Sequence, residues 1–153
     1  MAKRLRKQDV EERTIAKALS ILEARLKVRE VMSDVETVKN FLRLQAQGLE
    51  HEVFAVMYLD AKHRLIEYEQ LFRGTLTRSS VYPRDIVKQA LLKNAAAVIL
   101  HHNHPSGDCG ASAADEELTM RVEQALSIVD VRVLDHVITS DEGSLSMTSD
   151  QSR

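Results

Sequence analysis

Residues 101–115, HHNHPSGDCGASAAD, carry three of the chain's six histidines within four positions. If a strand continues through His102 and His104, both side chains point to the same face, because successive side chains of a strand alternate. Asp115, which opens the following helix, can reach back as a carboxylate ligand. Two imidazoles and one carboxylate leave a fourth tetrahedral position for water, the arrangement of a catalytic rather than a structural zinc site.

These residues also have structural interpretations. A His-x-His pair occurs by chance in exposed loops, and Ser112-x-x-Asp115 is the spacing of a helix capping box. Capping and metal binding are compatible, because capping does not use both carboxylate oxygens of Asp115. His101 is expected to point away from His102 and to be a non-ligand. Cys109 offers a competing Cys–His nucleophile pair, although a lone cysteine is more often incidental.

Hydrophobic periodicity predicts the elements that position this stretch. Amphipathic helices are expected at four places: 9–28, from Ser33 or Asp34 to Gly48, from Pro83 onward, and from Ser112 to about Ile128. Strands are expected at five: 53–59, 65–72, 95–100, 131–139 and 144–147. The order indicates a mixed α/β domain with about four to six strands. The histidines directly follow a buried strand, a common location for sites in layered α/β domains.

Length and composition set broad limits. The 153 residues are enough for one domain with a core, and 44% apolar and 29% charged residues are ordinary for a soluble globular protein. No apolar run approaches the roughly 20 residues of a membrane span, and no signal-type run follows the basic N-terminus. We therefore expect a cytoplasmic protein without a membrane partner. The single cysteine excludes an intrachain disulfide and a multi-cysteine zinc cluster.

The motifs resemble one known family. His102-x-His104, seven residues, Ser112, two residues and Asp115 resemble the JAMM signature of MPN-type metallopeptidases. The words HNHPSGD, FRGTL, YPRDIVKQAL, NAAAVIL and LDHVI are similar to the RadC-type branch of that superfamily. The resemblance covers about residues 34–140. It implies an α/β (α+β) fold with a mostly antiparallel curved sheet flanked by helices, of the MPN/JAB (cytidine-deaminase-like) type.

The resemblance also implies roles for individual residues. One Zn²⁺ per chain would be held with water by three ligands: His102, His104 and Asp115. Glu52, beside the first apolar strand, would be the general base that takes a proton from the water and later gives it to the leaving amine. Glu50 is its rival, two residues away on the same strand face. Ser112 would donate a hydrogen bond to the developing oxyanion.

The chain departs from the family pattern in three respects, one of which is its C-terminal tail, TSDEGSLSMTSDQSR. RadC-type sequences usually have prolines where this chain has Cys109-Gly110-Ala111. Full-length members also carry an N-terminal helix-hairpin-helix region associated with DNA, for which the chain before the core is too short. It therefore resembles a compact form. Three parts are predicted: a basic helical extension (1–31), an MPN/JAMM domain (32–148) and a frayed tail (149–153).

Three functions follow as hypotheses. The first is a zinc-dependent metallopeptidase-type hydrolase that cleaves a peptide or isopeptide amide in an unidentified protein or peptide substrate. The second is a DNA-repair-associated or mobile-element accessory protein, in which the metal is structural or the substrate is not a peptide. Residues 1–30 carry a net charge of +4 but the remainder −6, so nucleic acid is weakly supported. The third, a catalytically idle MPN scaffold, is disfavoured because every expected ligand and the base are present.

Overall fold

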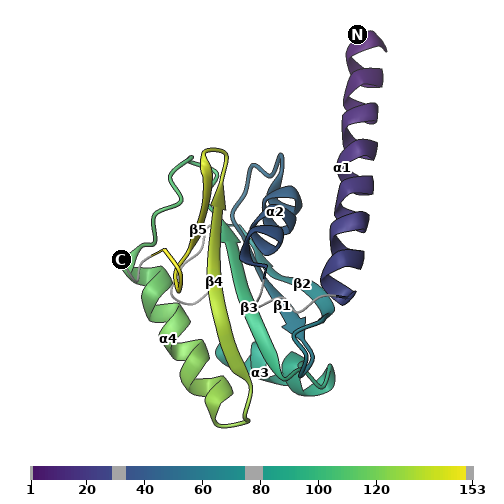
Figure 1. Cartoon of the computed structure of the whole chain (residues 1–153). Helices are drawn as coiled ribbons and strands as arrows, with labels where there is room; N and C mark the ends of the chain where they lie inside the picture. Colours follow the sequence, from purple (N-terminus) through teal and green to yellow (C-terminus); the bar gives the residue numbers. More distant parts are fainter. Residues whose placement is uncertain (1, 29–33, 75–80, 151–153) are drawn as a thin grey trace.

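The computed structural model describes residues 2–28, 34–74 and 81–150 (Figure 1). Five strands form one sheet: β1 (Val53–Leu59), β2 (Leu65–Arg73), β3 (Ala97–Asn103), β4 (Arg132–Ser140) and β5 (Gly143–Ser146). Their order in the sheet is β2-β1-β3-β4-β5. Only the β3–β4 pairing is parallel among these strands, and the other three are antiparallel. The prediction of a mostly antiparallel sheet with about four to six strands is therefore confirmed.

Four helices accompany the sheet: α1 (Ala2–Val28), α2 (Val35–Ala46), α3 (Pro83–Leu92) and α4 (Ala113–Ser127). The first half of α1 projects beyond the sheet in Figure 1, while Leu19 and Leu22 in its second half pack against the core. Helix α4 links β3 to the parallel strand β4, because parallel neighbours need a crossover connection. In the described ranges, no helix combines the length and the apolar character that a membrane crossing requires.

Local signals explain where the helices begin and end. Asp34 caps α2 by accepting a hydrogen bond from the Thr37 N–H at 3.3 Å, whereas its rival Ser33 lies outside the described residues. Gly48 follows α2 with a φ of 74°, a conformation that glycine adopts without a steric penalty. Pro83 occupies the first turn of α3, where its missing N–H costs nothing.

The core lies on both faces of the sheet. On one face, α2 packs over Met57, Leu59 and Ile99, and on the other, α3 and α4 pack over Phe54, Val56 and Leu100. Strand β1 is buried along its whole length, as its unbroken apolar run predicts. Because side chains alternate along β3, its two histidines face different layers: His101 the α2 side, and His102 the α3–α4 side.

Asp150, four residues after β5, contacts the domain. The Asp150 carboxylate lies 2.9 Å from the Lys39 ammonium and accepts a hydrogen bond of 2.7 Å from the Ser146 N–H. Asp150, which falls within the predicted tail 149–153, is therefore held to α2 and β5 by these contacts. The rest of that predicted tail, 151–153, lies outside the described residues.

Candidate metal centre

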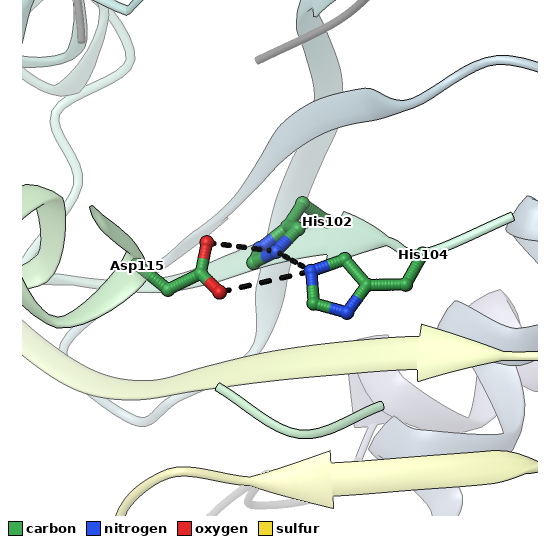
Figure 2. A group of neighbouring side chains, drawn as sticks. All are labelled: His102, His104 and Asp115. Atoms are coloured by element: carbon green, nitrogen blue, oxygen red, sulfur yellow. Dashed lines mark hydrogen bonds and ion pairs between the residues drawn. The ribbon is translucent and has the colours of Figure 1, made fainter. Parts of the chain in front are cut away.

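Three side chains meet where β3 ends and α4 begins (Figure 2). His102 is the penultimate residue of β3 and is buried, and His104 follows the strand. Their Nε2 atoms lie 2.7 Å apart. The Asp115 carboxylate of α4 places Oδ1 3.1 Å from the His102 Nε2 and Oδ2 3.6 Å from the His104 Nε2. A turn of α4 and one strand end therefore bring three potential ligands to one point.

The donor set and spacing of this cluster fit a divalent metal ion. All three ligand atoms lie within 4.8 Å of one another. A tetrahedral ion with bonds of about 2.0–2.1 Å separates its ligand atoms by roughly 3.4 Å, close to the distances found here. Imidazole nitrogen and carboxylate oxygen are both ligands that zinc accepts. His102, His104 and Asp115 thus form a possible metal-binding triad.

A capping box fixes the carboxylate of Asp115. The Ser112 Oγ accepts a hydrogen bond from the Asp115 N–H at 3.2 Å, and Asp115 Oδ2 accepts one from the Ser112 N–H at 2.7 Å. Burial raises the pKa of the Asp115 carboxyl, but the adjacent His102 ring and the hydrogen bonds from Ser112 outweigh burial and hold this pKa below its usual range. The capping interpretation is therefore confirmed, and it leaves the carboxylate ionised and facing both histidines.

The second ring nitrogen of each histidine has its own partner. The His104 Nδ1 lies 2.8 Å from the backbone carbonyl oxygen of Asp108. A carbonyl can only accept, so this nitrogen carries a proton, and in the neutral ring the His104 Nε2 then directs a lone pair toward the cluster. The His102 Nδ1 lies 2.7 Å from the Nε2 of His136, a buried residue of β4. Burial lowers the pKa of His136 well below its usual range, so its ring is neutral.

His101 belongs to a different network, on the other face of the sheet. Its Nδ1 lies 3.1 Å from the Tyr68 hydroxyl, and its Nε2 lies 3.0 Å from the Thr139 hydroxyl. Burial, followed by the nearby charge of His102, lowers the pKa of His101 to about 3. Both ring nitrogens of His101 are thus engaged away from the cluster, as the alternation of strand side chains predicts.

The triad opens into a cavity of about 120 Å³. Glu52, Ser112 and Arg121 line this cavity together with the three triad residues. Glu52 is half-buried and directly precedes β1, and continuing the β1–β3 register by two residues sets it opposite His104. Glu50 is exposed and is not among the residues that line the cavity. The cavity therefore favours Glu52 over Glu50 as the carboxylate near the triad.

Asn103 holds the segment that carries Glu52, a role that sequence reasoning missed. Its Oδ1 accepts a hydrogen bond of 2.6 Å from the Val53 N–H, and its Nδ2 donates one of 3.0 Å to the His51 carbonyl. These bonds bracket Glu52 and fix the backbone on both sides of it. The only signal in the sequence is an amide residue between two histidines, at a position that alternation places on the opposite face of β3.

The loop between the histidines and α4 is organised by Asp108. Its carbonyl accepts from His104, and its Oδ1 accepts a hydrogen bond of 2.8 Å from the Gly110 N–H. Cys109 is half-buried and is not among the residues that line the triad's cavity. The Cys109-Gly110-Ala111 segment, where the family usually has prolines, is therefore held in place by the hydrogen bonds of Asp108.

Comparison with known proteins gives a consistent result. Residues 32–152 match the family model described as a RadC-like JAB domain. The chain is 52% identical over 128 residues to a UPF0758 protein of Vibrio cholerae, covering 84% of this chain and 81% of that protein. It is 55% identical to one of Leptothrix cholodnii and 58% identical to one of Variovorax paradoxus, each over 123 residues. These two alignments cover 80% of this chain but only 55% of each relative, so the chain spans about half their length.

Proposed function

Because the chain belongs to the RadC-like JAB domain family, we propose that it is a zinc-dependent hydrolase that cleaves a peptide or isopeptide amide with an activated water molecule. One observation carries the proposal. Two imidazoles and a carboxylate that fit a metal ion share a cavity with a further carboxylate, that of Glu52. Ligands together with a separate proton acceptor are what metal-assisted hydrolysis requires.

The triad would hold the zinc ion. His104 offers a lone pair on Nε2, because its Nδ1 proton is given to the Asp108 carbonyl. Asp115 offers an ionised carboxylate fixed by the capping box. A zinc ion held by these three residues would lower the pKa of a bound water to about 7 and would polarise a substrate carbonyl.

Glu52 would act as the general base. Glu52 lines the same cavity as the triad, so its carboxylate would take a proton from the attacking water and later deliver it to the leaving amine. Asn103 supports this task, because its two hydrogen bonds hold the backbone on both sides of Glu52. A fixed base costs less to orient when the proton moves.

Ser112 would assist the developing oxyanion. Its Oγ accepts the Asp115 N–H in the capping box, a bond that uses a lone pair and leaves the hydroxyl proton. The residue lines the cavity, so that proton can be donated to a carbonyl oxygen that gains charge during attack.

The proposal is tested with Glu52→Gln, which keeps size and hydrogen bonding but removes the base. A library of peptides and isopeptide-linked peptides is first screened with zinc-loaded and chelator-treated protein to find a substrate. We expect Glu52→Gln to keep zinc and to lose turnover by about 100-fold or more. Glu50→Gln is the matched control and should retain turnover within a few-fold.

Three results would contradict the proposal. Loss of zinc from Glu52→Gln would make Glu52 a ligand, and the three-ligand site would be wrong. Equal turnover of Glu52→Gln and the wild type would remove Glu52 as the base. A wild-type protein that stays free of transition metal after zinc reconstitution would end the zinc proposal altogether.

A further inference from the structure

The two histidines of the triad are held by partners of different chemistry. His104 faces a carbonyl, which can only accept, so the proton position on its ring is settled. His102 faces another imidazole, that of His136. A neutral imidazole nitrogen can either donate or accept, so this contact alone leaves the proton of His102 on either nitrogen.

The next two contacts link the proton position on His102 to the direction of the Thr119 hydroxyl. The His136 Nδ1 lies 2.6 Å from the Thr119 Oγ1, which lies 2.7 Å from the backbone carbonyl of Asp115. If the hydroxyl donates to this carbonyl, its oxygen accepts the Nδ1 proton of His136. The His136 Nε2 then presents a lone pair, which accepts the Nδ1 proton of His102. The His102 Nε2 is left with a lone pair that faces His104 and Asp115.

The opposite arrangement, in which the Thr119 hydroxyl donates to His136, is incompatible with a metal ion at the triad. If the Thr119 hydroxyl donates to His136, each following proton moves to the other nitrogen. The His102 Nε2 then carries a hydrogen that points toward Asp115 and His104, where the ion would sit. A protonated nitrogen cannot be a ligand. The direction of the Thr119 hydroxyl therefore decides whether His102 can bind.

We propose that Thr119 and His136 are positioning residues that set the metal-binding tautomer of His102. This inference rests on the proposed zinc site. This series of hydrogen bonds starts at the backbone carbonyl of Asp115 and ends at the His102 ring, which faces the Asp115 carboxylate. Asp115 therefore contributes both its carbonyl, which accepts from Thr119, and its carboxylate, which is a candidate ligand. The ring of His136 is confined for this role, since it is buried and meets the Phe54 ring edge-on, with centroids 6.0 Å apart and planes at 82°.

The test pairs Thr119→Val with Thr119→Ser. Valine keeps the branched shape but has no hydroxyl, whereas serine restores the hydroxyl without the methyl group. Zinc affinity is measured by competition with a chelator. We expect Thr119→Val to bind zinc about 10- to 100-fold more weakly, the usual cost of losing a partner behind a metal-binding histidine, and Thr119→Ser to bind within a few-fold of the wild type.

A spectroscopic readout on the wild type needs no substitution. In zinc-loaded protein labelled with ¹⁵N-histidine, NMR should show both His102 and His136 carrying the proton on Nδ1. A His136 protonated on Nε2 would overturn the relay, as would a Thr119→Val variant with wild-type zinc affinity. In both cases the zinc site itself would stand. Absence of zinc binding by the wild type would instead overturn the proposed function and the relay with it.

Discussion

His101 and His102 are adjacent in one strand, yet the two faces of the sheet give them different surroundings. On the α2 side, two hydroxyls, those of Tyr68 and Thr139, engage both nitrogens of His101. On the α3–α4 side, the Nδ1 of His102 contacts the buried ring of His136, whereas its Nε2 faces His104 and Asp115 beside the cavity.

The difference lies in what each face demands of the ring. Hydroxyls donate or accept by rotating, so His101 is satisfied with the proton on either nitrogen. A metal ion accepts only a lone pair, so the His102 side needs partners that hold one tautomer. Two chemically identical residues are thus separated into a structural and a candidate ligand role by the strands and helices across from them.

The largest expected contrast is in metal content. Wild-type protein should hold about one zinc ion per chain, and His104→Ala should lose it. When zinc is present, that variant should melt at a lower temperature than the wild type, because a bound ion stabilises only the folded state. His101→Gln, changed on the other face, should keep its zinc. Metal analysis checks both, and stoichiometric zinc in His104→Ala would erase the distinction between the faces.

A smaller contrast concerns stability at acidic pH. The pKa of His101 is about 3 in the folded protein, against about 6.5 in the unfolded chain. As pH falls below 6.5, the unfolded state binds a proton that the folded state does not, so the stability present above 6.5 is progressively lost toward pH 3. Between pH 7 and 5, His101 alone should account for roughly 2 kcal/mol of lost unfolding free energy.

His101→Gln isolates this contribution. Denaturant unfolding of metal-free protein at a series of pH values should give a shallower loss of stability for the variant than for the wild type. His136 is present in both proteins, so its own titration cancels in the difference. If the unfolding free energies of the two proteins change with pH in the same way, burial does not keep His101 unprotonated.

The smallest effect is expected at Cys109. The loop around it is closed by hydrogen bonds of Asp108, so Cys109→Ser should retain zinc and any hydrolytic turnover within a few-fold. Zinc content and the substrate found in the peptide screen provide the measurement. Complete loss of turnover with zinc retained would favour the thiol nucleophile instead.

The candidate ligands could be predicted from the sequence because they are local. Alternation along a strand places His102 and His104 on one face, and the capping box three residues into a helix orients Asp115. The start of α1 could not be predicted in the same way. Periodicity begins at residue 9, but the helix starts at Ala2, since residues 2–8 are mostly good helix formers that lack an apolar face.

The supporting residues escaped sequence reasoning because they depend on pairing across the sheet. His136 reaches His102 only through the parallel β3–β4 register, and it stands in the sequence as a polar residue within an apolar strand. Asn103 reaches Val53 only through the antiparallel β1–β3 pairing. No spacing along the chain encodes either partner, so these contacts are visible only in the folded structure.

The parallel pairing of β3 with β4 has a consequence for how such a site can be inherited. The crossover through α4 gathers the three triad residues, together with Thr119 and His136, into one uninterrupted segment, 97–140. Recombination that exchanges this segment between relatives transfers the ligands and their orienting groups as one module. Glu52 lies outside it, before β1. The metal site and the proposed proton acceptor can therefore be separated by a single crossover event and can diverge independently.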